Sequence, residues 1–199
     1  MAAPAEPREA AEAAPKARDR IFAAAKDMFY RQGIRAVGVE SIVAAAGATK
    51  MSLYRSFPSK DDLVVAYLRE RDAVYWRWWD EIMDRHAGDP RAQIRALCES
   101  IAQRTCRAGY RGCPFTNAAT EFPDPDHPGR EVAAENKREL RARLRGLAAA
   151  TGARDAAALG DQLFLLIEGA YASGQIMGQH GPSMTIAAAA EALVANHCD

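Results

Sequence analysis

The sequence predicts an all-α protein in which an N-terminal three-helix domain with a helix-turn-helix precedes a larger helical C-terminal domain. Apolar residues recur at the three- and four-residue spacing of amphipathic helices through most of the chain. Glycine and proline interrupt this pattern, which favours helices joined by turns. Two very short helical patterns meet at Gly47, as they do in a helix-turn-helix. We place the boundaries at residues 1–15 for an arm, 16–62 for the first domain and 63–199 for the second.

Length and composition limit the class of protein. The chain has 199 residues, enough for a small domain and a larger one. Residues 1–15 are rich in Ala, Pro and Glu and lack the apolar stretch of a signal peptide, so we expect a disordered arm. No apolar run approaches the roughly 18 residues that span a membrane. We therefore expect a cytoplasmic protein with no membrane partner.

The formal net charge of zero hides an uneven distribution of charge. Residues 16–60 carry nine Lys or Arg against three acidic residues, a net charge of +6, so the remainder carries −6. Adding Asp61 and Asp62 reduces the excess to +4. A basic end on an acidic body suits a protein that presents one end to a polyanion such as nucleic acid.

The first domain can be followed helix by helix. A first helix carries apolar residues from Ile21 to Phe29 and ends at Gly33. A second, with Ile42, Val43 and Ala46 on one face, stops at Gly47, which can adopt the left-handed conformation. Taken alone, this segment would also fit a plain αα-corner.

The third helix of this domain is the expected recognition helix. Thr49 supplies its N-cap oxygen, and Leu53 and Phe57 point inward. Lys50, Ser52 and Arg55 are left on the outer face. Pro58 then breaks the chain, Ser59 and Asp62 form a capping box, and Lys60 falls in the first turn of a new helix.

Residues from about 16 to 68 resemble the TetR family of bacterial transcriptional regulators. The residues that carry the resemblance are Ile21, Ala25, Phe29, Gly33, Ile42, Ala46-Gly47, Thr49 to Phe57 and Ser59 to Leu63. The resemblance implies a DNA-binding first domain, and a second domain for ligand binding and dimerisation. Gly38 departs from the family pattern, which usually has Thr or Ser at this cap.

The resemblance also implies roles for the exposed residues. Thr49, Tyr54 and Lys60 match phosphate-contacting positions, whereas Lys50, Met51 and Ser52 match positions that read base edges. Arg55 would hold phosphate as well. Two such helices in a dimer would read a double-stranded, roughly palindromic operator about 34–36 Å, one DNA turn, from each other.

Six further helices are expected in the second domain. A long helix runs from Ser59 toward Arg85, with Trp76, Trp78 and Trp79 near its end. Shorter patterns follow over 94–105 and 114–122, the latter resembling a stretch in the effector domains of a subgroup of TetR-like regulators. A helix over 130–149 has Asp126 as its expected cap, and its Arg and Glu run indicates a solvated face.

The last two helices, over 155–178 and 183–196, carry apolar residues around most of their circumference together with many small residues. Such helices need cover on both sides. We expect them to pair with their two-fold mates as a four-helix dimer interface, an arrangement that the resemblance favours over the interior of a monomer.

In the resembling family the second domain binds an inducer that releases the protein, a repressor, from DNA. Aromatic walls with a few polar groups suit a small, mostly apolar effector. The candidate ligand-binding residues are Trp76, Trp79, Phe115, Asn117, Glu121, Phe122 and Tyr171.

Two alternatives rest on the cysteines. Cys98, Cys106, Cys113 and Cys198 show no CxxC or Cys/His metal spacing, so we expect neither a metal nor a cofactor. A redox sensor would use one of the first three. A small enzyme would use Cys113 with Glu121 and His127, which are near one another in sequence.

Overall fold

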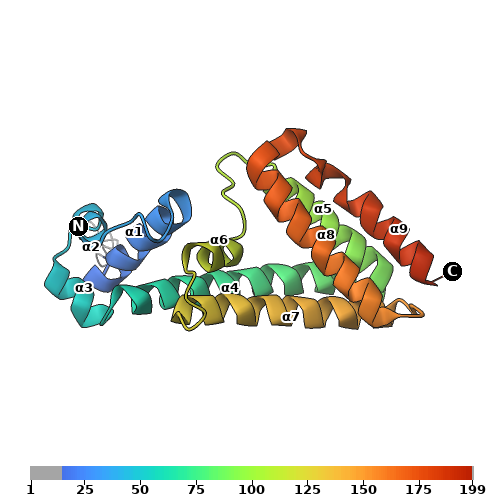
Figure 1. The fold of residues 1–199 in the computed structure, drawn as a ribbon, viewed down its shortest axis with the longest axis horizontal. Helices are drawn as coiled ribbons and strands as arrows, with labels where there is room; N and C mark the ends of the chain where they lie inside the picture. The colour runs from blue at the N-terminus through green and yellow to red at the C-terminus, as the bar shows by residue number, and fades with distance from the viewer. Residues whose placement is uncertain (1–14, 199) are drawn as a thin grey trace, which may run out of the picture.

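The computed structural model describes residues 15–198. The expected arm therefore lies outside the described residues, apart from Pro15. In the described part the helices are α1 Ala17–Gln32, α2 Val39–Ala45, α3 Lys50–Ser56, α4 Lys60–Arg85, α5 Pro90–Thr105, α6 Pro114–Glu121, α7 Pro128–Ala150, α8 Ala156–Met177 and α9 Ile186–Cys198, with two 3₁₀ turns, Gly178–His180 and Pro182–Thr185, before α9. Helices α1–α3 form a head at one end of an elongated molecule (Figure 1). The all-α prediction is confirmed.

The head folds as the local sequence predicts. The apolar side chains of Ile21, Ile42 and Leu53 are fully buried between the three helices. Gly47 adopts a φ of 55°, in the left-handed region that favours glycine. The Oγ1 atom of Thr49 accepts a hydrogen bond of 3.2 Å from the Ser52 amide and so caps α3. These contacts confirm the expected turn and cap.

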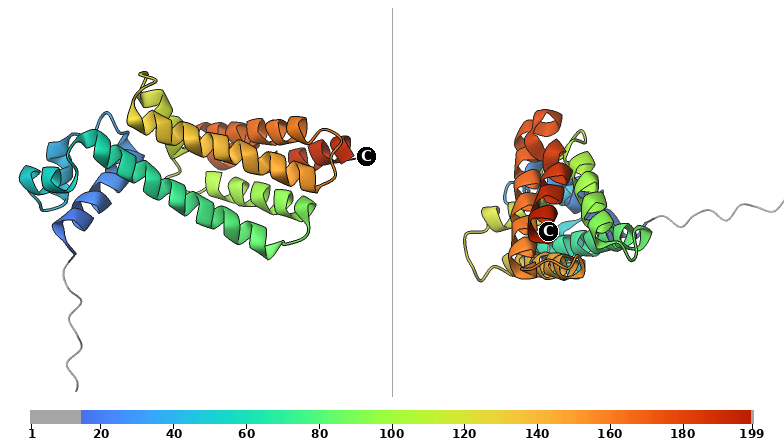
Figure 2. Two further views of the ribbon diagram at one scale, coloured as in Figure 1. Left: turned by 90° about the horizontal axis from the view of Figure 1, so that it is seen from below. Right: turned by 90° about the vertical axis from the view of Figure 1, so that its right-hand side faces the viewer.

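Helix α4 joins the head to the rest of the molecule without a break. The Ser59 hydroxyl oxygen accepts a 3.0 Å hydrogen bond from the Asp62 amide, which confirms the predicted start of the helix. The helix then runs beside α7 along the molecule (Figures 1 and 2). The boundary that the sequence placed between residues 62 and 63 thus falls inside the first turn of α4.

The body consists of α4–α9, with α5, α8 and α9 packed together at the end away from the head (Figure 1). Two predicted boundaries were wrong. Helix α7 begins at Pro128 and is capped by His127, whose Nδ1 accepts from the Gly129 amide at 3.1 Å, and not by Asp126. Helix α9 begins at Ile186 because residues 182–185 form a 3₁₀ turn.

Within residues 15–198, no helix is long and apolar enough to cross a membrane. No group of three or more His, Cys, Asp or Glu side chains with metal-binding geometry occurs in the same described residues.

Candidate nucleic-acid interface and effector cavity

Helix α3 presents a continuous exposed surface. The Met51 side chain is 71% exposed and Tyr54 is 48% exposed, whereas Leu53 between them is fully buried. Lys50 and Arg55 are also exposed. A short helix anchored by Leu53 and Phe57, with large side chains held out on the other face, has the form of a helix that enters the major groove of DNA.

The outer face of the helix-turn-helix contains an ion pair that the sequence did not indicate. Lys50 Nζ lies against a carboxylate oxygen of Glu40 on α2. The hydrogen bond from Lys50 lowers the pKa of Glu40, and the same contact raises the pKa of Lys50. Both side chains are exposed, so solvent screens the pair. Lys50 therefore already has an anionic partner before any phosphate or base reaches it.

Lys60 lies at the other edge of this surface, in the first turn of α4. Its side chain is half-buried, and burial lowers the pKa of its ammonium although the neighbouring Asp61 opposes the shift. The α4 N-terminus adds free amide groups at the same place.

Arginines near the head have partners within the protein. Arg20 donates from Nε to the Ala46 carbonyl at 3.0 Å and from Nη2 to the Gly47 carbonyl at 3.2 Å, so its guanidinium closes the turn of the helix-turn-helix. The Arg18 guanidinium lies 5.1 Å from the centre of the Phe57 ring. The guanidinium groups of Arg18 and Arg20 therefore make contacts within the protein and are not simply solvated charges.

The body contains a cavity of about 380 Å³ on the side facing the head. Its wall draws on α1, α4, α5, α6, α8 and the loop between α5 and α6. The lining residues are Tyr30, Arg71, Val74, Tyr75, Arg104, Arg107, Ala108, Gly109, Tyr110, Gly112, Cys113, Pro114, Phe115 and Tyr171. This volume is within the range of small-molecule sites.

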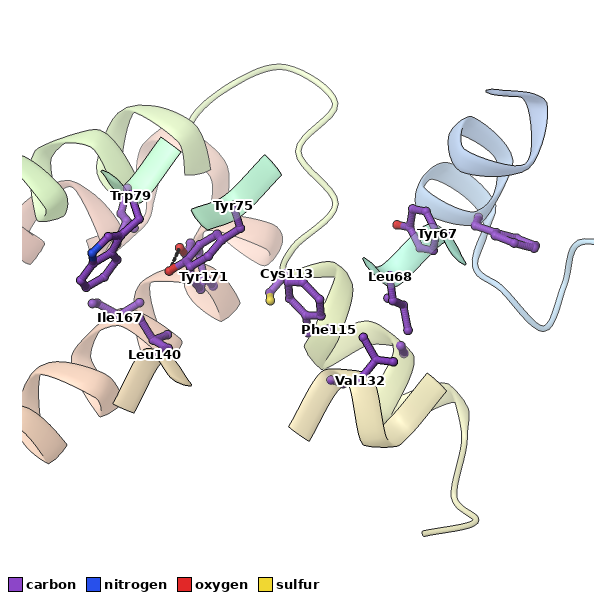
Figure 3. Close-up of a cluster of buried hydrophobic side chains, with 14 of the residues drawn as sticks. Tyr67, Leu68, Tyr75, Trp79, Cys113, Phe115, Val132, Leu140, Ile167 and Tyr171 are labelled. Atoms are coloured by element: carbon purple, nitrogen blue, oxygen red, sulfur yellow. Dashed lines mark hydrogen bonds between the residues drawn. The ribbon is translucent and has the colours of Figure 1, made fainter. Parts of the chain in front are cut away.

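Tyrosine hydroxyls supply part of the polar surface of the cavity. Tyr75 and Tyr171 point toward each other from α4 and α8, with Tyr171 Oη donating to Tyr75 Oη at 3.5 Å (Figure 3). Burial raises the pKa of both phenols, so both stay protonated at neutral pH. Tyr110 Oη is buried without a hydrogen-bond partner among the described residues.

Sequence and structure comparisons identify the family. Residues 21–67 match the family described as bacterial regulatory proteins, tetR family, and residues 90–190 match the tetracyclin repressor-like, C-terminal domain. The chain belongs to the TetR family. It is therefore a ligand-responsive, DNA-binding transcriptional regulator and not an enzyme.

Individual relatives support the assignment. A TetR-family transcriptional regulator from Streptomyces coelicolor, SCO4454, is 32% identical with a TM-score of 0.87, over 92% of this chain and 96% of that one. A TetR-type regulator from Streptomyces avermitilis, sav143, is 31% identical with a TM-score of 0.79, over 92% and 98%. The transcriptional regulator LmrA of Bacillus subtilis is 29% identical over 124 residues, which are 61% of this chain and 65% of LmrA.

Of the seven predicted ligand-binding residues in this TetR-family regulator, only Phe115 and Tyr171 line the cavity. Trp79 is buried in the core (Figure 3). Trp76 donates from Nε1 to Asp72 at 2.9 Å, and Asn117 donates from Nδ2 to the Arg111 carbonyl at 2.7 Å. These contacts hold the side chains in the body, away from the cavity wall.

The other two predicted ligand residues, Glu121 and Phe122, also lie outside the cavity wall. Phe122 stacks on the His127 ring with centroids 3.6 Å apart. The Glu121 carboxylate accepts a 2.7 Å hydrogen bond from the Arg35 amide, so it joins α6 to the head. Asn117 and Glu121, which the sequence predicts on one polar face as ligand contacts, thus both bind backbone groups of the protein itself.

A second link between body and head passes through the cavity itself. Tyr30 on α1 lines the cavity, and its hydroxyl accepts from the Arg111 amide at 2.9 Å and donates to the Gly112 carbonyl at 3.4 Å. Sequence reasoning missed Tyr30 because it assigned α1 wholly to the head. A side chain of the DNA-binding head is thus part of the cavity wall.

The cysteines differ in their surroundings. Cys98 is buried, and burial raises the pKa of its thiol to about 12, so it stays protonated. Cys113 lines the cavity and its Sγ lies 3.4 Å from Lys137 Nζ, which also contacts Glu168 at 2.5 Å. Burial opposes the charge on Lys137, but Cys113 and Glu168 together raise its pKa.

The enzyme alternative needed Cys113, Glu121 and His127 to act together. Cys113 meets Lys137, Glu121 meets Arg35, and His127 Nε2 lies 3.5 Å from Asp61. None of the three hydrogen-bonds to another of them within residues 15–198. The nucleophile therefore lacks the adjacent base that this chemistry requires.

Proposed function

We propose that the protein represses transcription by binding a roughly palindromic double-stranded operator as a homodimer, and that a small effector in the cavity releases it. The exposed outer face of α3 carries the proposal, because Met51 and Tyr54 have no structural reason to be held in solvent. As a DNA-binding regulator with no membrane-crossing helix in residues 15–198, the protein would act in the cytoplasm.

The DNA contacts divide into two groups. Lys50, Met51 and Ser52 begin α3, where side chains reach base edges, and the apolar Met51 suits a thymine methyl group. Thr49, Tyr54, Arg55 and Lys60 would hold phosphates. Lys50 must release Glu40 before its ammonium can bind a base.

The dimer would form through α8 and α9. Leu165, Gly169, Ala172 and Ile176 follow one face of α8 and are exposed, with the Leu165 side chain 69% and Ile176 83% exposed. Such a stripe is costly in water and suits a second copy of the same helix. Replacing Ile176 by Glu should yield monomers by sedimentation analysis, and a variant that stays dimeric would refute this interface.

The effector would act through the two links to the head. A molecule bound in the cavity would contact Tyr30 directly and move the loop whose Arg111 and Gly112 bind the Tyr30 hydroxyl. A shift of α6 would reach Arg35 through the hydrogen bond to Glu121. Only differential binding to the two head positions can change operator affinity, and a coupling of about 1–3 kcal/mol corresponds to about 5–150-fold.

The division of DNA contacts is tested with a panel of operator sequences selected with the purified protein. Lys60→Ala should weaken binding to every sequence by a similar factor, because phosphates carry no sequence information. Ser52→Ala should change the ranking of sequences. Arg77→Ala, on the exposed face of α4 in the body, is the control and should do neither. Identical profiles for the Lys60 and Ser52 variants would refute the division, and failure of the wild type to select any sequence would refute the function.

A second candidate mechanism, redox sensing, is favoured by one contact. The ammonium of Lys137 lies 3.4 Å from the sulfur of Cys113, which is part of the cavity wall. With hydrogen peroxide, Cys113 reacting as the thiolate would attack one oxygen and break the O–O bond, giving a sulfenic acid and hydroxide. Operator affinity that falls with peroxide in the wild type but not in Cys113→Ser would support it, and equal affinity with and without peroxide would exclude it.

A further inference from the structure

The charged residues of the cavity are all cationic. Arg71 on α4, Arg104 at the end of α5 and Arg107 just beyond it are part of the wall. None of the residues that line the cavity is Asp or Glu. No carboxylate within residues 15–198 lies within 4 Å of any of these three guanidinium groups, whereas six of the other twelve arginines of the body have ion pairs.

Two of the three arginine side chains lie against aromatic rings, and none of the three is hydrogen-bonded to an acceptor of the described residues. The Arg104 guanidinium lies 4.3 Å from the centre of the Trp78 ring, and Arg71 lies 5.4 Å from that of Tyr30. Stacking of this kind occupies the flat face of a guanidinium and leaves the N–H edge able to donate. The side chains of Arg71, Arg104 and Arg107 donate no hydrogen bond to another described residue.

The acids near the cavity have partners of their own. Glu168 contacts the Lys137 ammonium at 2.5 Å, Glu70 contacts Lys26 at 2.8 Å, and Asp72 accepts from Trp76 and Asn136 at 2.9 Å. The lysines neutralise Glu168 and Glu70, and Asp72, which is bound by neutral donors, can offset at most one of the three arginines. An excess of unpaired positive charge on a partly enclosed wall produces a potential that attracts anions.

The rest of the wall suits a flat ring. Tyr75, Phe115 and Tyr171, which Figure 3 labels, supply aromatic surface to the wall together with Tyr110. Ring stacking would orient an aromatic molecule whose charged end meets the arginines.

We propose that the effector of this cavity is an aromatic anion, a carboxylate or an equivalent acid on one or two rings. The inference rests on the proposed function, in which the cavity takes the effector. It replaces the mostly apolar molecule that the sequence indicated. That expectation relied on the aromatic residues, whereas the arginines reach the wall only through the tertiary fold.

The test uses matched pairs that differ in charge and keep their shape. Binding of benzoate and benzamide, and of 2-naphthoate and 2-naphthamide, to the full-length protein is measured by isothermal titration calorimetry. Each carboxylate should bind at least about tenfold more tightly than its amide, because the amide cannot accept charge-assisted hydrogen bonds from guanidinium groups. The cationic 2-naphthylmethylammonium should bind more weakly than the neutral amide.

Arginine variants test whether the preference for carboxylates arises from the cavity wall. Arg71→Gln and Arg107→Gln should each bring the affinity of the better carboxylate to within about threefold of its amide, while leaving the affinity for the amide unchanged. Arg77→Gln is the control, since it removes an equal charge from the exposed side of α4 outside the cavity. Circular dichroism spectra that match the wild type show that the variants are folded.

The outcomes separate this inference from the proposed function. Amides that bind as tightly as carboxylates, a carboxylate preference unchanged in both cavity variants, or no binding of any probe at about 1 mM would overturn the inference even if the protein still selects an operator. Failure to select an operator, with the carboxylate preference intact, would overturn only the repressor proposal.

Discussion

The α3 surface and the cavity differ in how the chain builds them. Residues 49–60 supply the candidate DNA contacts from one continuous stretch, and short-range caps at Thr49 and Ser59 fix their positions. The cavity wall combines side chains from α1 to α8, as distant in sequence as Tyr30 and Tyr171. The first surface can be deduced from neighbouring residues, whereas the second exists only after the helices pack. Mutations should therefore separate the two regions.

The largest difference between the effect on operator binding and the effect on cavity binding is expected from Leu53→Ala. Leu53 is fully buried in the head, and truncation of a buried leucine costs about 2–5 kcal/mol. Chemical denaturation should show a destabilised head and loss of operator binding, while calorimetry still detects carboxylate binding in the cavity. Met51→Ala, on the exposed side of α3, should change stability by less than about 0.5 kcal/mol. Equal loss of cavity binding in Leu53→Ala would show that the two regions fold as one unit.

The converse change is in the body, at Gly160 on α8. A Cβ at this position would lie 2.6 Å from the Cα atom of Arg145 on α7, so α7 and α8 would have to move apart. Overpacking of this kind costs about 1–3 kcal/mol. Thermal unfolding of Gly160→Ala should show that loss, whereas Gly146→Ala, which meets no atom within 4 Å, should be neutral or stabilising. Similar melting temperatures for the two variants would contradict the close approach.

A smaller effect is expected at the cap of α3. Thr49→Ala removes the oxygen that accepts from the Ser52 amide and should cost about 0.5–2 kcal/mol. Operator affinity should fall with it, because α3 frays and a phosphate contact is lost. Thr49→Ser keeps the oxygen and should retain most of both properties in denaturation and DNA-binding assays. If the serine variant behaves like the alanine variant, the cap does not account for the loss.

The smallest effect, and one of opposite sign, is expected at Glu40. Glu40→Gln releases Lys50 and removes a negative charge from the face that meets DNA. Operator affinity at low salt should rise about two- to fivefold, because solvent screens an exposed ion pair and keeps the effect small. Glu139→Gln disrupts a comparable exposed pair with Arg143 on α7 and should leave operator affinity unchanged. A lower affinity in Glu40→Gln would mean that Glu40 positions Lys50 for DNA.

These differences explain what could be read from the sequence. The helices, the left-handed Gly47 and the caps at Thr49 and Ser59 depend on residues within four positions of one another, so local patterns predicted them. The contacts of a long side chain depend on where its terminal atoms lie in the folded protein. Arg20 reaches the turn after α2, and Glu121 reaches the Arg35 amide, contacts that no periodicity encodes. The cavity arginines were missed for the same reason.

The unbroken course of α4 has a mechanical consequence. A helix of 26 residues is about 39 Å long, so a tilt of about 5° at its far end displaces Lys60 by about 3 Å. That displacement is close to the rise of about 3.4 Å between neighbouring base pairs. A ring bound beside Arg71, Val74 and Tyr75, near the middle of this helix, would need to tilt it only slightly to move the head by about the spacing of one base pair.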